Sequence, residues 1–392
     1  MYKNVCKHIS AGCPAYLLKF LKRNKYVVRR SKCGFNCENC PYFRKPCIGC
    51  AIETCLVDKC IRGTSYTGIT YPRSFCRLRQ YCPIGGKDRP LPMPVPPLGR
   101  KQIARVKFSK FIPEIDVTDQ RSWVWRDGFQ VSEVFVPLWQ LLTNGNILIQ
   151  ASRKGLHDYL DFDGRILLST VMPDELIDRL ETRDYFRLIN DLKPDATMVP
   201  DNYTYTDVPL YQSWSQTIRL VSFANDFLKL DTPLIGLVKG ANLCQMDWAV
   251  RKQVEMGYSS LAMPARELFE EERLDEFLPY VLSTLKRSFR RKNGFEFLLY
   301  GVGARLWEYK DISYSNLSWF LRAKHGEYYW DGLFYDLRDP VIRFEECYCE
   351  ACGGMMPQDI IDLWFEDKER AMKTLAAHNL LDLSRLKRRK RR

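Results

Sequence analysis

Between residues 102 and 345, short apolar runs that suit β-strands alternate with longer segments whose apolar positions recur at helical spacing. We expect strands over residues 131–137, 147–150, 165–169, 196–200, 234–239, 260–263 and 297–303, and helices over 173–180, 185–192 and 277–285. Alternation over this length is typical of an α/β protein with a parallel sheet. Periodicity alone does not separate a closed barrel from an open, doubly wound sheet.

The segments on either side of this α/β region have a different composition. Residues 84–101 are rich in proline, which fixes φ and removes amide donors, so we expect a semi-rigid linker there. Residues 1–83 hold eleven of the fifteen cysteines and little continuous apolar face, which predicts a cysteine-rich metal-binding module. The expected order is therefore this module, the linker, an α/β domain over 102–345, and a C-terminal subdomain with a basic tail over 346–392.

The chain is strongly basic. Its 392 residues carry a formal net charge of +13, which favours a polyanionic partner, and nucleic acid over a membrane surface. The last six residues, 387–392, are all Lys or Arg and should attract phosphates without sequence preference. No apolar run approaches the roughly 20 residues of a spanning helix, and the N-terminus lacks the apolar core of a signal peptide. We therefore expect a cytoplasmic protein with no membrane partner, in which cysteines indicate metal ligands rather than disulfides.

Three cysteines near the C-terminus, Cys347, Cys349 and Cys352, fall within six residues, and His378 follows in a helical stretch. This spacing lets three thiolates surround one ion without long loops, and the imidazole can complete a tetrahedron. Three sulfurs and one nitrogen suit a closed, structural Zn²⁺ site. Because no coordination position stays open, such a site would fasten the C-terminal helix and would not carry out chemistry.

The C-x-C-x2-C motif, its helical spacer and the run 378–380 (His-Asn-Leu) together resemble the zinc signature of the tRNA-guanine transglycosylases. The archaeosine-forming, archaeal branch is most similar. This family exchanges a guanine in tRNA for a 7-deazaguanine base on the way to archaeosine or queuosine. The resemblance implies a TIM (β/α)8 barrel with a C-terminal zinc-binding subdomain and a site at the C-terminal ends of the strands. It extends over residues 155–167, 192–201, 236–240, 257–262 and 300–303.

By this resemblance, both carboxylates that the family uses in catalysis are replaced. Ser169 stands where one aspartate assists catalysis, and Ser315 stands at the position of the nucleophilic aspartate. Base exchange needs an oxygen nucleophile to capture C1′ of the ribose, and an unassisted serine hydroxyl does not do this at neutral pH. A second acid or base must manage the proton of the departing base. Asp311 could substitute as nucleophile after a shift in strand register.

The base-binding residues are better preserved. Asp201 corresponds to the aspartate that recognises the purine, although a lone Asp at a strand end is also a common cap. Lys239 and Gly240 correspond to a V-Q-G turn of the family, with Lys239 in place of its glutamine.

The N-terminal cluster contains seven candidate ligands, Cys33, Cys37, Cys40, Cys47, Cys50, Cys55 and Cys60. Either a second zinc ion or a [4Fe–4S] cluster suits these ligands. The first three have the C-x3-C-x2-C spacing of radical S-adenosylmethionine enzymes, but those enzymes need their own barrel after the motif. Small cysteine-rich modules fit better, and disulfides stay open if the source is a hyperthermophile.

Three functions follow from these observations. The first is base exchange of a guanine for a 7-deazaguanine in tRNA or DNA, with altered catalytic residues. The second is a non-catalytic relative that binds nucleic acid, as a homodimer or paired with an active transglycosylase subunit. The third is an enzyme that modifies a 7-deazaguanine base with the N-terminal cluster as an iron–sulfur partner.

Overall fold

The computed structural model of the chain describes residues 97–203, 210–240, 243–266, 274–289, 294–302, 312–330, 332–339 and 347–385. The expected cysteine-rich module, most of the expected linker and the basic tail lie outside the described residues. The candidate site residues that also lie outside them are Cys33, Cys37, Cys40, Cys47, Cys50, Cys55, Cys60 and Asp311.

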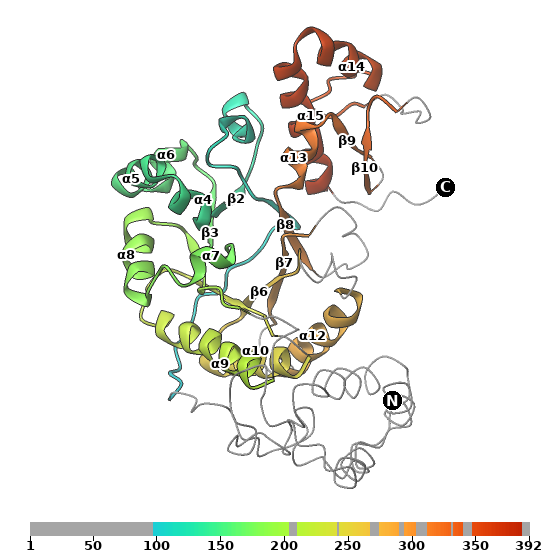
Figure 1. Ribbon diagram of the computed structural model, residues 1–392. Coiled ribbons are helices and arrows are strands. Elements are labelled where there is room, and N and C mark those ends of the chain that lie inside the picture. The colour runs from blue at the N-terminus through green and yellow to red at the C-terminus, as the bar shows by residue number, and fades with distance from the viewer. Residues whose placement is uncertain are drawn as a thin grey trace, which may run out of the picture.

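The centre of the molecule is an eight-stranded parallel sheet that curls into a nearly closed barrel (Figure 1). Its strands are β1 (Phe111–Pro113), β2 (Glu133–Pro137), β3 (Arg165–Ser169), β4 (Ala196–Met198), β5 (Leu234–Leu237), β6 (Ser260–Pro264), β7 (Glu296–Tyr300) and β8 (Ser313–Asn316). Strands β2 to β8 are neighbours in chain order, and β1 pairs with β8. A bridge between Glu114 and Phe135, and a 3.0 Å hydrogen bond from Ile115 N–H to the Phe135 carbonyl, link β1 back to β2. The structure thus confirms the expected TIM-like α/β fold.

Helices follow most of the strands and cover the outside of the barrel (Figure 1). In the described residues they are α4 (Leu138–Thr143), α5 (Gly145–Lys154), α6 (Leu156–Leu160), α7 (Asp174–Ile177), α8 (Thr182–Leu192), α9 (Leu210–Phe227), α10 (Leu243–Met256) and α12 (Leu274–Ser288). The amphipathic pattern explains their placement: in α8 the buried residues Tyr185, Ile189 and Leu192 are spaced by three or four positions. Each helix can therefore turn one apolar stripe to the sheet and keep its polar face outside.

One expected strand is wrong. Residues 147–150 lie inside α5, whose start is capped by Asn144: its side-chain oxygen accepts a hydrogen bond from Ile147 N–H at 3.3 Å. A run of four residues fits either a buried strand or one face of a helix, and here the cap decides. The two barrel strands absent from the expected set are β1 and β8, of three and four residues, which the pattern of apolar runs did not reveal.

Side chains fill the interior of the barrel. Phe135 on β2 and Tyr300 on β7 belong to strands that are not neighbours, yet their ring centroids are 5.5 Å apart, so they meet across the interior. Register partners in a sheet share a face, and alternate residues along a strand return to that face. Ser315 is the β8 partner of Tyr300, and Ser169 lies two residues beyond Leu167, the β3 partner of Phe135. Both serines therefore also face inward.

The chain after β8 forms a C-terminal subdomain beside the barrel (Figure 1). It contains α13 (Ser318–Lys324), the hairpin of β9 (Glu327–Trp330) and β10 (Leu333–Asp336), α14 (Pro357–Glu366) and α15 (Lys368–Arg385). Helix α15 packs against α13, α14 and β9, and also reaches β1 of the barrel. Helix α15 thus joins the hairpin and α14 to the barrel.

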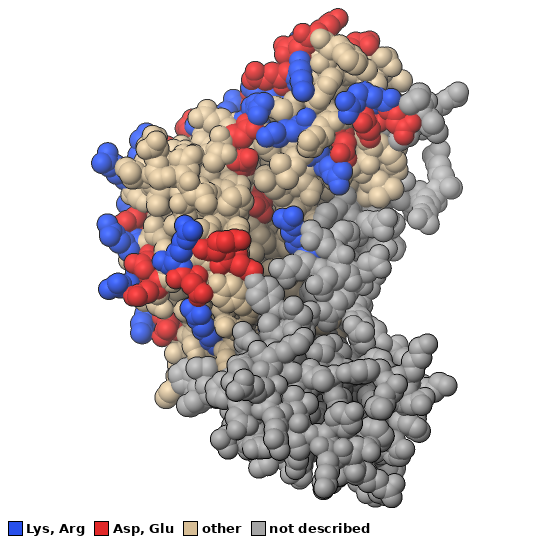
Figure 2. Space-filling view, in the orientation of Figure 1, with Lys and Arg blue, Asp and Glu red and all other residues tan. Residues whose placement is uncertain are grey.

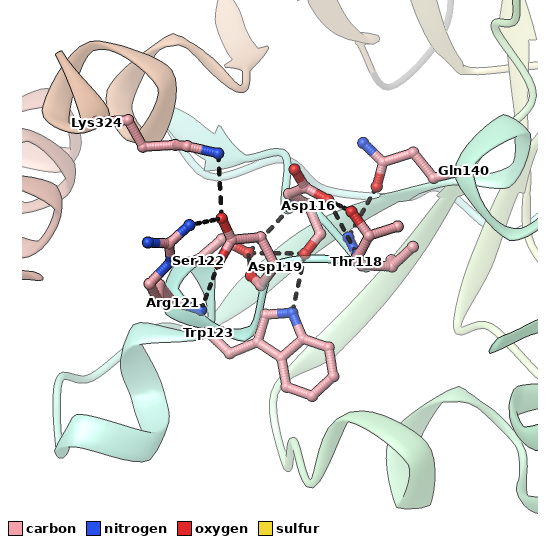
Figure 3. Close-up of polar contacts among 9 residues, drawn as sticks. Asp116, Thr118, Asp119, Arg121, Ser122, Trp123, Gln140 and Lys324 are labelled. Carbon is pink, nitrogen blue, oxygen red and sulfur yellow. Dashed lines mark hydrogen bonds and ion pairs between the residues drawn. The ribbon is translucent and has the colours of Figure 1, made fainter. Parts of the chain in front are cut away.

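The loop between β1 and β2 binds this subdomain through polar side-chain contacts (Figure 3). It includes two short 3-10 helices, η3 (Gln120–Ser122) and η4 (Val124–Asp127). The Asp116 carbonyl accepts the indole N–H of Trp123 at 3.2 Å, and the Asp119 carboxylate binds both Arg121 and, at 3.1 Å, the ammonium of Lys324 on α13. The subdomain is therefore fastened to the same loop that leaves β1.

The last residues of the expected linker run along α9 and α10. Gly99 N–H donates to the side-chain oxygen of Asn225 at 2.7 Å, and Lys101 N–H donates to the Met256 carbonyl at 3.1 Å. Gly257 has φ of +112°, and a Cβ there would lie 2.0 Å from the Lys101 carbonyl oxygen. Only glycine allows this close approach, so the end of the expected linker at Lys101 packs directly against the turn at Gly257.

Candidate functional site

Cys347, Cys349, Cys352 and His378 lie together in the C-terminal subdomain, and their ligand atoms are all within 4.8 Å of one another. His378 Nδ1 is 3.5 Å from Sγ of Cys347 and 3.4 Å from Sγ of Cys349 and of Cys352. A tetrahedral Zn²⁺ with bonds of about 2.3 Å to sulfur and about 2.0 Å to nitrogen requires an S···N edge of about 3.5 Å. The three distances therefore match a metal-sized tetrahedron, and the group can hold a metal ion such as zinc.

The loop that carries the cysteines is shaped by its two glycines. Gly353 and Gly354 have φ of +59° and +90°, and their N–H groups donate to the carbonyls of Cys349 (2.8 Å) and Cys347 (3.0 Å). The chain therefore folds back tightly after the third cysteine. The N–H of Cys352 donates to Sγ of Cys349 at 3.4 Å, which fixes this sulfur within the loop.

His378 on α15 is oriented by its second nitrogen. Its Nε2 donates to the Tyr329 carbonyl at 3.0 Å, and the Tyr328 ring stacks on the imidazole with a centroid separation of 3.9 Å. A carbonyl only accepts hydrogen bonds, so the proton is on Nε2 and the lone pair of Nδ1 is turned to the three sulfurs. Metal-binding histidines commonly donate their second ring nitrogen to a carbonyl in this way, which fixes the orientation of the ring.

The protonation of this group fits exchange of protons for a cation. Burial lowers the pKa of His378, but hydrogen bonds that the sulfurs of Cys347 and Cys349 accept raise it, and the resulting pKa is about 10. Without a metal ion, Nδ1 can therefore hold a proton. A divalent cation bound by the sulfurs would take the place of that proton, which is how structural metal sites couple metal binding to proton release and to folding.

A second group of polar side chains lies inside the barrel, at the C-terminal ends of the strands. It consists of Glu114, Ser169, Tyr300 and Ser315, which come from the ends of β1, β3, β7 and β8, and we call it the polar layer. None of the four is more than 8% exposed. The Tyr300 hydroxyl forms hydrogen bonds with both Glu114 and Ser169, and burial followed by the charge of Glu114 raises the pKa of Tyr300 well above its usual value. Tyr300 therefore keeps its proton, and its hydroxyl links Glu114 at the end of β1 to Ser169 at the end of β3.

Glu114 is the only carboxylic acid of the polar layer. Burial raises the pKa of Glu114 to about 7, although the Tyr300 hydrogen bond and the charge of Arg266 oppose this shift. Its backbone is fixed on both sides, since its N–H donates to the Asn316 carbonyl at 3.1 Å and its carbonyl accepts the indole N–H of Trp319 at 3.0 Å. The carboxyl can therefore change protonation near neutral pH without a change of backbone position.

Asp201 and Lys239, both expected to bind the base, are brought together. The Lys239 ammonium is 2.6 Å from Asp201 Oδ1 and donates to the Asn202 carbonyl at 2.8 Å. The same Asp201 oxygen accepts Asn202 N–H at 2.7 Å, and the Asp201 side chain is 2% exposed. The Asp201 charge also acts on Tyr300, so the pair belongs to the barrel end that holds the polar layer.

The other expected residues are less closely joined to this pair. Ser315 is fully buried, and its Oγ has no hydrogen-bond partner within the described residues. Gly240 packs against the start of α10, where an added Cβ would lie 2.8 Å from the Cβ of Gln245. The lack of a side chain at Gly240 is therefore explained by helix packing, with no need for a bound base.

Sequence analysis missed Glu114 and Tyr300. Glu114 follows a three-residue strand that carries no clear pattern, and Tyr300 was only part of an apolar run. The available signal was a single acidic residue directly after the apolar triplet Phe111–Pro113, which is a weak one.

The excess positive charge of the chain is not spread over the barrel. Residues 1–96 contain 18 Lys and Arg against 4 Asp and Glu, and residues 387–392 add six more basic residues. The net positive charge of these two segments together is larger than the +13 of the whole chain, so residues 97–386 carry a net negative charge. On the face shown in Figure 2, basic and acidic side chains of the described residues are interspersed.

Among the described residues, no helix is long and apolar enough to cross a membrane. A scan against protein-family models finds no family that matches this chain, and a search of curated proteins finds no match either.

Proposed function

We propose that this chain is a tRNA-guanine transglycosylase-like protein that exchanges a guanine of a nucleic acid for a 7-deazaguanine base. The observation that carries the proposal is the pairing of a Cys3His cluster with a parallel barrel whose strand ends hold Asp201 and Lys239. In this proposal the cluster binds Zn²⁺ as a structural ion, because its four ligands leave no open position.

The Asp201–Lys239 pair has the polarity that a guanine edge needs. Guanine presents the O6 acceptor, for which an ammonium is a suitable donor. Its N1–H and exocyclic amino group are donors, for which a carboxylate is a suitable acceptor. In the absence of a base the two side chains satisfy each other at 2.6 Å, and an incoming guanine edge would replace that ion pair with two new contacts.

The nucleic acid would be held by the ends of the chain. The barrel and the C-terminal subdomain are acidic overall, so attraction of phosphates depends on residues 1–96 and 387–392. Either tRNA or DNA fits this electrostatic contact, which carries no sequence information.

A second candidate is a non-catalytic subunit that binds nucleic acid, alone as a homodimer or with an active transglycosylase. The observation that favours it is the presence of Ser169 and Ser315 hydroxyls where the resemblance leads one to expect carboxylates. Phe365 of the C-terminal subdomain is a strongly exposed aromatic residue (76%), as a contact residue for a partner subunit would be.

The test is incorporation of labelled guanine or a 7-deazaguanine base into bulk tRNA and into DNA by the purified full-length protein. Asp201→Asn should reduce incorporation at least about 100-fold, the loss that follows when a buried polar contact to substrate is left unpaired. Asp195→Asn is the matched control, since Asp195 precedes β4 while Asp201 follows it, and it should retain activity.

The outcomes separate the candidates. Incorporation that also disappears in Asp311→Ala would identify Asp311 as the nucleophile. Tight, salt-sensitive binding of nucleic acid without incorporation would support the non-catalytic subunit. Absence of both binding and incorporation would overturn the proposed function.

A further inference from the structure

The buried carboxyl of Glu114 is not explained by packing. Interior positions of a small barrel are usually filled by apolar side chains, and a buried ionisable group costs free energy unless it is fully paired. Within the described residues, its only hydrogen-bond partner among side chains is Tyr300, which is neutral. A buried ionisable residue that lowers stability and lies at the C-terminal end of a barrel strand is a candidate for a catalytic role.

Two more polar atoms near this barrel end are buried and unsatisfied. Ser315 Oγ and Asn202 Oδ1 have no hydrogen-bond partner in the described part of the chain, and both residues are fully buried. Ser315 faces the interior, as the register partner of Tyr300. Glu114 lies two residues beyond Ile112, the β1 partner of Ser315, so the unpaired hydroxyl and the buried acid share the interior face. Buried polar groups are nearly always paired, so this unpaired hydroxyl next to a buried acid indicates that a polar ligand completes the site.

We propose that Glu114 is a catalytic residue of the base exchange, on which this inference rests, and that it transfers the proton of the base. Tyr300 and Ser169 are positioning residues, because they hold the carboxyl through a chain of hydrogen bonds. Glu114 would thus supply the acid–base function that the serines at positions 169 and 315 cannot.

The protons of the exchange balance with this single group, while C1′ of the ribose, left short of an electron pair when guanine departs, is captured by the oxygen nucleophile of the reaction and released from it when the incoming base adds. As the bond between C1′ and N9 of guanine breaks, its electron pair stays with the base, and the Glu114 carboxylic acid donates its proton to a ring nitrogen of that base. The incoming 7-deazaguanine then forms a bond from its N9 to C1′ and loses the N9 proton to the Glu114 carboxylate. One base leaves with one proton, one base arrives and gives up one proton, and the carboxylic acid is restored.

The chemical setting of Glu114 suits both halves of this cycle. A group that donates and then accepts a proton works best when its pKa lies near the operating pH, and the pKa of Glu114 is raised to about 7. Its fixed backbone keeps the carboxyl in one place for the two transfers.

The test compares wild-type protein with Glu114→Gln, Glu114→Asp and, as a matched control, Glu133→Gln. Glu133 is a buried glutamate at the start of β2, at the opposite end of the barrel, where it pairs with Arg165. We expect Glu114→Gln to lower kcat about 10²- to 10⁴-fold, the usual contribution of general acid–base catalysis. Glu114→Asp should recover part of the rate, and Glu133→Gln should keep it.

A second readout follows the proton itself. The pH profile of kcat should lose its limb near pH 7 in Glu114→Gln. Calorimetric binding of 7-deazaguanine and of guanine, in buffers of different ionisation enthalpy, should show proton exchange that this variant abolishes.

The outcomes distinguish the two proposals. Exchange by Glu114→Gln at the wild-type rate, or identical base affinity and proton exchange in both proteins, would overturn the role of Glu114 alone. No exchange by the wild-type protein, with base binding and proton exchange that depend on Glu114, would overturn the proposed reaction but keep Glu114 as a base-binding acid. If the wild-type protein neither exchanges nor binds a base, both proposals fail.

Discussion

The Cys3His cluster and the polar layer are both buried groups of polar side chains, but they are completed in different ways. In the cluster, every ligand atom points to one common centre, and the second nitrogen of His378 is bound to the Tyr329 carbonyl. In the polar layer, Glu114 and Tyr300 bind each other while the Ser315 hydroxyl has no partner within the described residues. One group can close around a single small ion, whereas the other keeps a buried hydroxyl that no side chain of the described residues satisfies.

The difference shows what each region can contribute. A closed tetrahedron of thiolates and imidazole stabilises the fold and offers nothing to a substrate. An incompletely satisfied layer destabilises the fold slightly and offers donors and acceptors to a ligand, as active sites commonly do. The following predictions test whether stability depends on the first region and pH response on the second.

The largest effect is expected from removal of a ligand of the Cys3His cluster. Cys349→Ala leaves three ligands and should release the metal, with a loss of more than about 5 kcal/mol of unfolding free energy in the C-terminal subdomain, because structural zinc contributes about 10–16 kcal/mol in small metal-bound domains. Metal content by mass spectrometry and thermal unfolding check this result.

The matched control for this variant is Cys244→Ala, a cysteine of α10 that belongs to the barrel. It should keep the metal content of the wild-type protein. Unchanged metal content in Cys349→Ala would contradict the assignment of the cluster as a metal site.

The contrast between the two regions also explains what the sequence could reveal. The Cys3His cluster was predicted because three of its ligands fall within six residues, and cysteines spaced this closely are typical of ligands to one metal ion. The barrel was predicted only as alternating strands and helices, and its closure depended on the resemblance. Closure itself comes from the Glu114–Phe135 bridge, which no local pattern encodes.

The polar layer could not be predicted, because its members are distant in sequence. Glu114 and Tyr300 are brought together from β1 and β7 only by the curvature of the sheet, and β1 is too short to show a strand period. The expected strand over 147–150 is wrong for a related reason, since the Asn144 cap outweighs three consecutive apolar residues. Asp201 and Lys239 were each expected, but their direct pairing follows from the adjacency of β4 and β5.

A pH-dependent stability is expected from Glu114. Its native pKa of about 7 lies above the ordinary value of 4.5, so the unfolded chain loses this proton first as pH rises. The carboxyl is therefore tolerated below about pH 4.5, and its cost grows through about pH 7 to about 3 kcal/mol. Urea unfolding at pH 5 and pH 8 should show a larger loss of stability in the wild-type protein than in Glu114→Gln. An equal loss in the two proteins would contradict the buried, ionisable carboxyl.

A smaller effect is expected at Asn379, next to His378. Its side-chain oxygen accepts Tyr329 N–H at 2.8 Å, and its amino group donates to the carbonyls of Trp319 (3.2 Å) and Glu327 (3.0 Å). Asn379→Ala leaves these backbone groups unpaired and should cost about 2 kcal/mol of unfolding free energy. Asn379→Asp keeps the acceptor but places a buried carboxylate oxygen against the two carbonyls, so it should cost at least as much. If both variants unfold with the wild-type midpoint in urea, the hydrogen bonds of Asn379 do not hold α15 to β9.

The smallest effect is expected where the C-terminal subdomain meets the loop after β1. Lys324 binds the Asp119 carboxylate at 3.1 Å, but Arg121 binds the same carboxylate, so Lys324→Met should cost less than about 1 kcal/mol. The hydrogen bond from Arg121, partly offset by burial and followed by that from Lys324, lowers the pKa of Asp119 to about 2. The contribution of this carboxylate is present above its unfolded pKa near 3.8 and is lost as pH falls through about 2.

The difference between Lys324→Met and the wild-type protein should therefore disappear in acid as Asp119 becomes protonated. Lys286→Met is the matched control, since Lys286 is an exposed lysine of α12 that forms no ion pair within the described residues. It should unfold like the wild-type protein at every pH. A stability loss in Lys324→Met that persists unchanged at pH 2 would mean that the lysine acts through packing of its carbon chain or through its ammonium over the Phe320 ring, and that its pair with Asp119 contributes little to this junction.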